Sequence, residues 1–262
     1  MDNEKTGILL VHYGTSNDKS RAQTIDKLNS RVAETFPDCA VVEAYSAPSV
    51  IKTLAKRGIK KLYISQALDS LKALGCNKLV VQSTMLLDGV MTEMLRTEVV
   101  KVKNDFRAVS VVRPLLYSVD DCRTMIEMLT KSLLADKSVA TKKSQVVLVG
   151  HGSDSPANAM YCQIDYLLKA EGQSSWHVGT IEGFPTIENV EQQLRNSKNK
   201  NVILVPLLYI AGNHLYNDIN GEWRHQLEAA GYTVDVVTEG LGDMPEIQQL
   251  IIRNINQLIN QL

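Results

Sequence analysis

Short apolar runs alternate with longer stretches of helical periodicity along the chain, and this alternation limits the folds available to it. The strand-like apolar runs cover residues 7–13, 40–45, 78–85, 109–112, 145–150, 176–181, 201–208 and 232–237. Helical patterns cover residues 16–35, 66–74, 90–104, 119–135, 155–170, 186–195, 215–229 and 246–261. Strands that alternate with helices predict βαβ units and parallel sheets with right-handed crossovers. Because the strands are almost entirely apolar, helices should cover both faces of each sheet, which predicts an α/β, doubly wound fold.

The second half of the chain repeats the order of the first. Residues 11–15 match 149–153, residues 42–45 match 181–184, and residues 79–89 match 203–213. With 262 residues, the chain has room for two lobes of ordinary domain size. The polar stretch 136–143 separates the halves, so we expect similar lobes at residues 1–136 and 137–262 with an active-site cleft between them.

The composition excludes several classes of protein. A formal net charge of −1 lacks the basic surface that binding to nucleic acid or to a membrane surface requires. The four cysteines are scattered, which is neither a disulfide framework nor a zinc motif and fits a reducing cytosol. We find no leader-like N-terminus and no apolar run near the roughly 18 residues of a membrane span. We therefore expect a cytoplasmic protein with no nucleic-acid or membrane partner.

The most informative short segment is Gly150-His151-Gly152, at the end of the apolar run 145–150. In open α/β sheets, ligands bind at the carboxyl ends of the strands. A histidine between two glycines at that place is either a turn residue with no further role or a catalytic or metal-binding group. The segment by itself favours neither interpretation.

Two further polar residues, Glu182 and His214, follow the next two strands of the second half. The carboxyl ends of neighbouring parallel strands meet at one edge of a sheet, so both side chains can converge with His151. Two imidazoles and a carboxylate suit a divalent transition metal. Either imidazole can also accept a proton near neutral pH. Asp218, four residues after His214, is placed to orient that ring.

The first half has no matching pair of histidines. It has Tyr13 and approximately Val90 opposite the two histidines, while Glu43 stands at the place matched to Glu182. Taken alone, Glu182 also reads as an exposed loop glutamate. A metal site is therefore predicted in the second half only. His12 is next to the matching position, but strand alternation turns it away, which favours a structural role.

Glycine turns precede helices in both halves, and one of them is Gly14-Thr15-Ser16. Free backbone amides at such a turn can bind a carboxylate or a phosphate. The sequence contains no Walker loop and no Gly-x-Gly-x-x-Gly fingerprint, so we expect no nucleotide cofactor.

Four segments together resemble one protein family. They are Tyr-Gly-Thr-Ser at 13–16, Gly-His-Gly at 150–152, Ile-Glu-Gly-Phe-Pro at 181–185 and Val-Pro-Leu-Leu-Tyr-Ile-Ala-Gly-Asn-His-Leu-Tyr-Asn-Asp at 205–218. The likeness continues through Gln82-Ser83 and Gly-Leu-Gly-Asp-Met-Pro at 240–245, so it covers essentially the whole chain. The pattern resembles the class II tetrapyrrole chelatases and is most similar to the anaerobic sirohydrochlorin cobaltochelatases of cobalamin biosynthesis. The segment around His214 is its most specific part.

The resemblance implies two doubly wound lobes that hold a tetrapyrrole substrate, and insertion of Co²⁺ as the substrate metal without ATP. Carried over residue by residue, it implies a metal site of His151, Glu182 and His214. It makes His151 and His214 the catalytic residues, and His151 the acceptor of a pyrrole proton.

In the first half, the resemblance implies that Tyr13, Gly14 and Thr15 line the macrocycle pocket. His12 departs from the family pattern, where a small or apolar residue is expected. Nearby basic residues such as Lys19 and Arg21 are candidates to meet the carboxylates of the substrate.

Alternatives remain open at this point. Iron or nickel could be the inserted metal, since the ligand set alone does not choose among Co²⁺, Fe²⁺ and Ni²⁺. A carrier that binds a tetrapyrrole or a metal without turnover could keep the same residues. The sequence also leaves open whether the chain forms a homo-oligomer.

Overall fold

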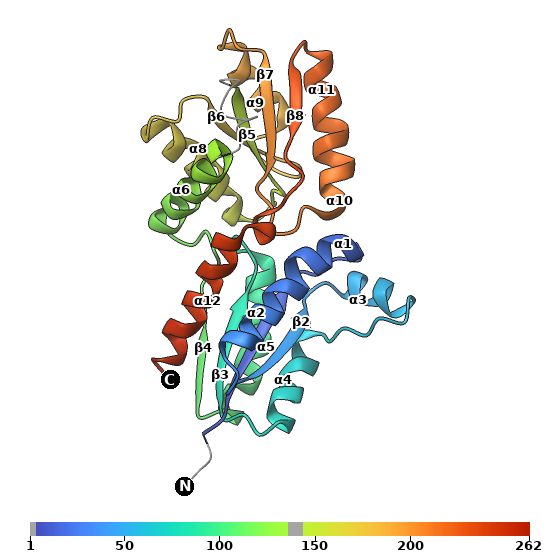
Figure 1. Ribbon diagram of the computed structural model, residues 1–262, viewed down its shortest axis with the longest axis vertical. Helices are drawn as coiled ribbons and strands as arrows, with labels where there is room; N and C mark the ends of the chain where they lie inside the picture. The colour runs from blue at the N-terminus through green and yellow to red at the C-terminus, as the bar shows by residue number, and fades with distance from the viewer. Residues whose placement is uncertain (1–3, 136–143) are drawn as a thin grey trace. The chain divides into compact units, whose positions relative to one another are not determined.

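The computed structural model describes residues 4–135 and 144–262, and the chain divides into two compact units. The first unit runs to Leu115 and also includes Gly242–Leu262, while the second unit is Leu116–Leu241. Each unit contains a four-stranded parallel sheet with helices packed around it (Figure 1). The predicted α/β class with two similar parallel-sheet lobes is confirmed.

The sheet of the first unit has the strand order β2-β1-β3-β4. Its strands are β1 (Thr6–His12), β2 (Ala40–Tyr45), β3 (Lys78–Ser83) and β4 (Ala108–Val111). The central strand β1 pairs in parallel with both neighbours, and Val11 lies opposite Ala44 on one side and Ser83 on the other. Ile8 and Leu9 point to opposite faces and are both fully buried, because helices cover both faces of the sheet.

The sheet of the second unit repeats this topology with the order β6-β5-β7-β8. Its strands are β5 (Gln145–Gly150), β6 (Trp176–Thr180), β7 (Asn201–Pro206) and β8 (Thr233–Val236). The central strand is β5, and Val149 lies opposite Gly179 of β6 and Pro206 of β7. All eight strand-like runs predicted from the sequence therefore form strands, within two residues of the expected ends.

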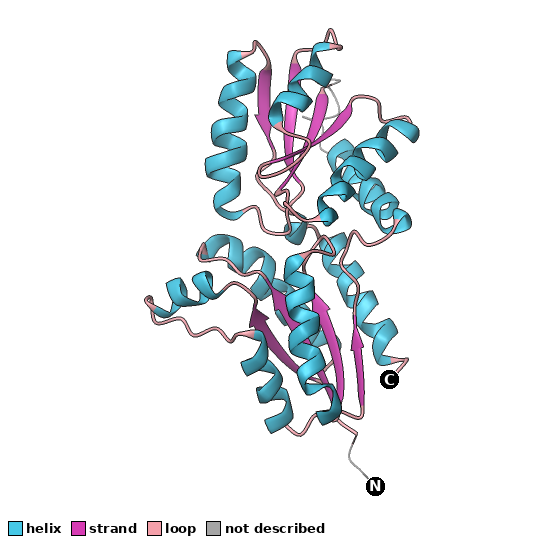
Figure 2. Ribbon diagram, turned by 180° about the vertical axis from the view of Figure 1, so that it is seen from behind, coloured by secondary structure: helices cyan, strands magenta, loops and turns pink. Residues whose placement is uncertain are grey.

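Helices connect the strands in both units and lie on both sides of each sheet (Figure 2). The helices before the second sheet are α1 (Asp18–Arg21), π-helical η1 (Ala22–Asp26), α2 (Lys27–Thr35), α3 (Pro48–Ala55), α4 (Ile64–Ala73), α5 (Val90–Val102), η2 (Lys103–Asp105) and α6 (Val119–Ala135). Those after β5 are η3 (Pro156–Asn158), α8 (Ala159–Ala170), α9 (Ile187–Arg195), α10 (Gly212–His214), π-helical η4 (Leu215–Trp223), α11 (Arg224–Ala229), η5 (Leu241–Asp243) and α12 (Pro245–Ile259).

The last helix of each half belongs to the other unit. Helix α6 follows β4 but packs against α8 of the second unit, and α12 follows β8 but packs against α2 and β3 of the first unit. The apolar stripe of α12 is buried there and consists of Ile247, Ile251, Ile252 and Ile255. The expected division at residues 136 and 137 lies outside the described residues and differs from the compact units, because α6 packs with the second unit and α12 with the first.

A buried glutamine holds α12 to the first unit. Gln248 is fully buried, and its side chain accepts a hydrogen bond of 2.9 Å from Arg31 of α2. Its amide nitrogen donates to the carbonyl oxygen of Gly242 at 2.7 Å. Both ends of the buried amide are thus satisfied, as burial of a polar group requires.

The strand register shows which residues of the two units are equivalent. Ser46 N–H donates to the carbonyl oxygen of His12, and Ile181 N–H donates in the same way to Gly150. One residue further on, Ala47 donates to Tyr13 and Glu182 donates to His151. Tyr13 is therefore equivalent to His151, as the sequence predicted.

The same register corrects one predicted match. Glu43 pairs with Leu10 in the first sheet, and the equivalent pair in the second sheet is Val178 with Leu148. The first-unit counterpart of Glu182 is therefore Ala47 and not Glu43. The sequence match failed because it aligned two carboxylates and ignored their different distances from the strand end.

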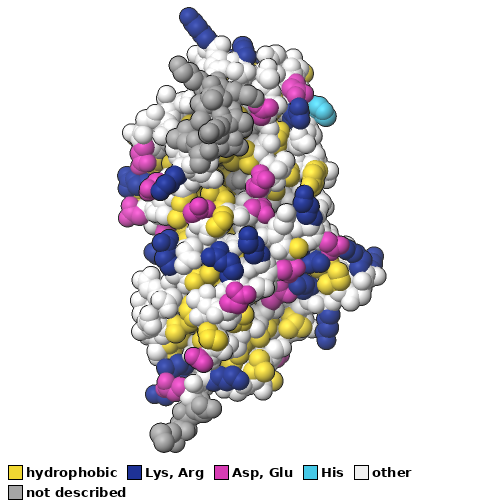
Figure 3. All heavy atoms as spheres, viewed as in Figure 1, with side chains coloured by type: hydrophobic (Ala, Val, Ile, Leu, Met, Phe, Trp, Pro, Cys, Tyr) yellow, Lys and Arg dark blue, Asp and Glu magenta, His cyan; other side chains and the backbone are white. Residues whose placement is uncertain are grey.

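One face of the molecule, drawn in Figure 3, is mixed in charge. On the face drawn in Figure 3, Lys and Arg side chains are interspersed with Asp and Glu side chains over both units. Within residues 4–135 and 144–262, no helix combines the length and the apolar character needed to span a membrane.

Candidate functional site

His151 and His214 lie together in the second unit. His151 directly follows β5, and His214 ends α10 after the loop that leaves β7. The centroids of the two imidazole rings are 4.8 Å apart, and the ring planes meet at 83°. Because β5 and β7 are neighbours in the sheet, their carboxyl ends deliver both rings to one place.

Steric contacts explain why both residues that flank His151 are glycines. A Cβ atom at Gly150 would lie 2.1 Å from Cε1 of Tyr161. Gly152 has a φ of +88°, and a Cβ atom there would lie 2.3 Å from the carbonyl oxygen of Glu182. No side chain larger than hydrogen fits either place without a shift, so the turn presents His151 between two bare backbone positions.

Tyr161 of α8 packs against the Gly-His-Gly turn. Its side chain is 2% exposed, and its hydroxyl oxygen accepts a 3.4 Å hydrogen bond from the N–H of Gly152. Burial raises the pKa of the Tyr161 phenol, and the backbone hydrogen bond only partly offsets this, so the hydroxyl stays protonated. Sequence reasoning missed this residue, since an aromatic side chain on the buried face of a helix is no sign of a site.

Asp218 holds the ring of His214. Oδ2 of Asp218 accepts a hydrogen bond from Nδ1 of His214 at 2.7 Å, which confirms the contact predicted from their spacing. Residues four apart lie on the same side of a helix, and this pair bridges α10 and the π-helical η4. π-helical turns are frequent at functional sites.

The hydrogen bonds assign the same tautomer to both histidines. Nδ1 of His151 lies 3.1 Å from the carbonyl oxygen of Gly152, and Nδ1 of His214 contacts the Asp218 carboxylate. A carbonyl or an ionised carboxylate only accepts, so Nδ1 carries the proton in each ring. Nε2 of each ring then has a lone pair available for a metal ion.

The carboxylate of Glu182 does not complete a ligand group with the two histidines. Among residues 4–135 and 144–262, no three His, Cys, Asp or Glu side chains are grouped closely enough to hold a metal ion. The backbone of Glu182 is nonetheless beside the histidine turn, because its N–H donates to the carbonyl oxygen of His151 at 2.7 Å. Its side chain is exposed.

Asn158 joins the loop of Glu182 to the turn of His151. Its Oδ1 accepts from the N–H of Ser153 at 3.0 Å, and its Nδ2 donates to the carbonyl oxygen of Phe184 at 2.6 Å. A Cβ atom at Gly183 would lie 2.6 Å from Oδ1 of Asn158, which explains the glycine that follows Glu182. Sequence reasoning missed Asn158, because its two partners lie in separate loops.

The loop that leads to His214 is held by residues that follow β8. Leu241 N–H donates to the carbonyl oxygen of Leu208 at 2.8 Å. A Cβ atom at Gly240 would lie 2.9 Å from the backbone nitrogen of Ala211. The Gly-Leu-Gly segment noted in the sequence is therefore a close backbone support for the loop that carries His214.

In the first unit, the turn of Tyr13, Gly14 and Thr15 shares with the histidine turn a glycine of positive φ and a matching backbone hydrogen bond. Gly14 has a φ of +98°, and a Cβ atom there would lie 2.3 Å from the ring of Tyr45. Tyr13, the counterpart of His151, has a side chain that is 52% exposed. Thr15 is partly exposed, and its Oγ1 accepts from the N–H of Asn17 at 3.1 Å.

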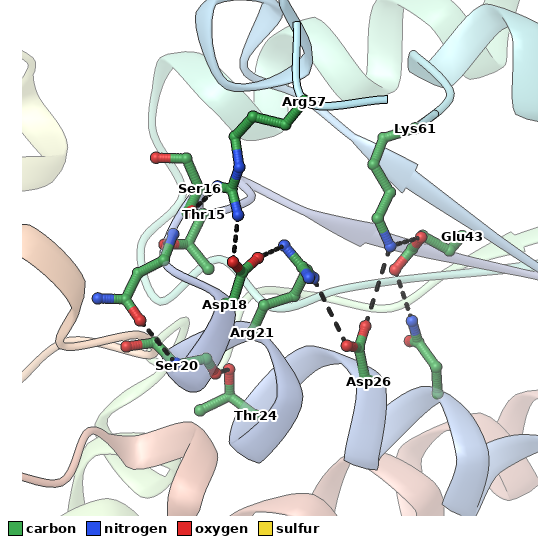
Figure 4. Close-up of polar contacts among 12 residues, drawn as sticks. Thr15, Ser16, Asp18, Ser20, Arg21, Thr24, Asp26, Glu43, Arg57 and Lys61 are labelled. Carbon is green, nitrogen blue, oxygen red and sulfur yellow. Dashed lines mark hydrogen bonds and ion pairs between the residues drawn. The ribbon is translucent and has the colours of Figure 1, made fainter. Parts of the chain in front are cut away.

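Arg21 is already engaged with carboxylates of its own unit. Its side chain is only 13% exposed and lies between Asp18, at 2.8 Å, and Asp26, at 3.5 Å (Figure 4). Arg57 also reaches this group, pairing with Asp18 and donating to the carbonyl oxygen of Ser16. These contacts weaken the expectation that Arg21 meets the carboxylates of a substrate.

The chain is similar to known proteins over nearly its whole length. A family model described as cobalt chelatase (CbiK) matches residues 6–260. The sirohydrochlorin cobaltochelatase of Salmonella typhimurium is 27% identical over 261 residues, covering 98% of this chain and 97% of the relative. The sirohydrochlorin cobaltochelatase CbiKC of Nitratidesulfovibrio vulgaris is 27% identical over 265 residues, covering 98% of this chain and 92% of the relative.

The fold also matches a solved structure. SirB from Bacillus subtilis with Fe³⁺ has a TM-score of 0.71 to this chain at 17% identity, covering 97% of this chain and 95% of SirB. This likeness concerns the fold, whereas the family match spans nearly every residue of the sequence. The chain therefore belongs to the cobalt chelatase (CbiK) family and is a metal chelatase.

Proposed function

We propose that this chain inserts Co²⁺ into sirohydrochlorin, and that the metal is delivered from His151 and His214. The relatives named above as sirohydrochlorin cobaltochelatases support this substrate and this metal. The observation that carries the proposal is the pair of imidazoles 4.8 Å apart, each with Nδ1 engaged and Nε2 available. Neutral imidazole nitrogen is a suitable ligand for divalent transition metals.

Glu182 is proposed as the third ligand. Its backbone is hydrogen-bonded to His151, and a change of side-chain rotamer is the movement proposed to bring the carboxylate to the histidine pair. If the carboxylate binds only once the metal is present, the metal has three protein ligands and keeps open coordination positions. Such a site suits a metal that must leave again, because open coordination positions permit ligand exchange.

Metal release and proton transfer are linked by stoichiometry. Insertion of Co²⁺ into the macrocycle displaces two pyrrole N–H protons. Each imidazole that releases the metal regains a lone pair on Nε2, and that lone pair can accept one proton. His151 accepts the first proton in this scheme, and His214 or water accepts the second. The exchange needs no nucleotide.

The first unit is proposed to contact the macrocycle through Tyr13, Gly14 and Thr15. The exposed ring of Tyr13 offers an apolar face to a flat substrate, and Gly14 leaves the backbone of the turn bare. The equivalence of Tyr13 with His151 supports a division in which one unit holds the metal and the other holds the ring.

The test measures insertion of the metal directly. Sirohydrochlorin and Co²⁺ are mixed with the purified chain, and the change in absorption is followed against an enzyme-free control. The His151→Ala and His214→Ala variants should lose both Co²⁺ binding and acceleration. His225→Ala is the matched control, because His225 is an exposed histidine of α11 in the same unit. No acceleration by the wild type, or full activity of the double variant, would refute the proposal.

The same assay separates the alternatives. Replacing Co²⁺ by Fe²⁺ or Ni²⁺ at equal free concentration ranks the metals by rate, which affinity order alone does not predict. A carrier would bind sirohydrochlorin or metal without repeated turnover, so product in molar excess over protein identifies an enzyme.

A further inference from the structure

We infer that His12 is a positioning residue, which fixes the macrocycle-contacting turn of the first unit against the loop that leaves β3. The inference rests on the proposed function, because that turn carries Tyr13, Gly14 and Thr15. His12 itself is fully buried at the end of β1. Its two ring nitrogens bridge elements far apart in the sequence.

One nitrogen faces the end of β3 and the other faces α2. Nδ1 of His12 lies 3.1 Å from Oγ1 of Thr84, and Nε2 lies 3.0 Å from Oδ1 of Asn29. Thr84 is the first residue after β3, and its N–H donates to the carbonyl oxygen of Val11 at 2.9 Å. The imidazole therefore adds a side-chain link between two strand ends that are already joined by their backbones.

A charged pair determines the direction of every hydrogen bond in this group. Glu43 accepts from Nζ of Lys61 at 2.5 Å and from Nδ2 of Asn29 at 2.7 Å (Figure 4 shows the Glu43 and Lys61 side chains). Nδ2 is the donor end of the Asn29 amide, so Oδ1 must face His12 and accept from Nε2–H. Nδ1 of His12 is then unprotonated and accepts from the hydroxyl of Thr84.

The ring of His12 also supports the turn through Tyr45. The two ring centroids are 6.3 Å apart with planes at 84°, an edge-to-face contact. The ring of Tyr45 lies directly under Gly14, at a distance that excludes any Cβ atom there. His12 thus acts on both sides of the turn, through Tyr45 at the end of β2 and Thr84 after β3.

The second unit indicates that the fold does not require histidine at this place. The residue equivalent to His12 is Gly150, and the ring of Tyr161 packs over it. A glycine covered by an aromatic ring is therefore sufficient to end the central strand in this topology. The histidine is a specific feature of the unit that is proposed to hold the macrocycle.

The neutral state of His12 agrees with this role. Burial lowers the pKa of the imidazole, and the Glu43 carboxylate opposes this shift. The charged groups that face His12 are Glu43 of β2, Lys61 before α4 and Asp26 of η1. Only a neutral ring can donate at Nε2 and accept at Nδ1 at the same time.

The experiment compares Thr84→Val with Thr84→Ser. Valine keeps the shape of threonine but removes the hydroxyl that bonds to His12, whereas serine keeps the hydroxyl. We expect Thr84→Val to raise the KM for sirohydrochlorin about 10-fold, the effect of losing one buried hydrogen bond, with kcat and Co²⁺ affinity nearly unchanged. Thr84→Ser should stay near the wild type. His12→Phe, which keeps a ring against Tyr45 but has no ring nitrogen, should raise KM by at least as much.

The outcomes separate the inference from the proposed function. Binding of sirohydrochlorin to the wild type without metal is first measured by absorption titration, and no binding there would refute the proposed function. If the wild type binds but Thr84→Val binds equally well, the positioning role of His12 is wrong. A fall in kcat at constant KM in Thr84→Val would also overturn it, because that would place His12 in the chemical step.

Discussion

The two units share a topology and a strand register, yet they end their central strands differently. The first unit has His12 and Tyr13 where the second has Gly150 and His151. In the first unit the imidazole is buried and bonded on both sides, and the exposed residue is a tyrosine. In the second unit the imidazole has moved one residue along, onto the turn. Neighbouring positions at a strand end point to opposite sides, so a difference of one position decides the role of the histidine. At the first position His12 is buried and structural, and at the second His151 is a candidate metal ligand.

What the units have in common is the backbone of the turn. Gly14 and Gly152 both adopt a positive φ, +98° and +88°, and each packs so closely that a Cβ atom is excluded. The glycine conformation is therefore kept although the residue before the glycine differs between the units. The chemistry of each unit is then decided by the side chain placed between strand and glycine.

The largest effect is expected when the two turns are made alike. His151→Tyr places the first-unit residue in the second-unit turn, and it should lower chelation activity on the order of 10³-fold. Removing a residue that hydrogen-bonds to a metal ligand already lowers metal affinity or activity 10–100-fold, and this variant removes the proposed ligand itself. Steady-state rates with saturating Co²⁺ would measure this. Activity within a few-fold of the wild type would mean that His151 is not part of the metal site.

The shared turn itself can be tested through its glycine. Gly152→Ala should destabilise the second unit by about 2–4 kcal/mol, because the new methyl group meets the Glu182 carbonyl and the backbone has a left-handed conformation. Gly172→Ala is the matched control, since its φ is +84° but nothing lies within 4 Å of its Cβ position. It should lose about 1 kcal/mol. Urea unfolding of both variants measures the difference, and equal losses would contradict the close contact.

A smaller effect is expected from the orientation of the second histidine. Asp218→Asn keeps the size of the side chain but weakens the hydrogen bond to Nδ1 of His214, so Co²⁺ affinity should fall about 10-fold. Isothermal titration of Co²⁺ into the metal-free protein measures this. Glu222→Gln, an exposed carboxylate of the same helix η4, should leave the affinity unchanged. An equal loss of Co²⁺ affinity in both variants would mean that the negative charge of the region matters and that orientation of the His214 ring does not.

The smallest effect concerns one buried histidine in each unit. Burial lowers the pKa of His12 and of His177, which favours the neutral form of both rings in the folded chain. Their contribution to stability is fully present above the unfolded pKa of about 6.5 and is lost as the pH falls below it, because the unfolded chain then binds protons that the folded chain does not. Each ring should remove up to about 1 kcal/mol of the free energy of unfolding over the first pH unit below that value. Urea unfolding at several pH values tests this, and stability that does not fall below pH 6.5 would contradict it.

Sequence reasoning reached the strands, their parallel order and the meeting of His151 with His214, because all three follow from apolar periodicity and from the edge where parallel strands end. It did not reach Tyr161 or Asn158, whose roles depend on which loop a helix happens to touch. The false match of Glu43 with Glu182 had a related cause. Two carboxylates near strand ends look alike in sequence, but the register separates them by four residues.

Helix α6 belongs to the second unit and α12 to the first, and this arrangement has a consequence for any attempt to divide the protein. A chain cut between the halves, near residue 137, would leave the N-terminal fragment without α12, the helix that covers its sheet. Four buried isoleucines would be lost from that core, worth roughly 6–12 kcal/mol in total, comparable with the whole stability of a domain. Neither fragment should fold alone, yet the two together should reconstitute the chelatase by complementation. The two units thus repeat one architecture, and we expect neither half of the chain to fold without the other.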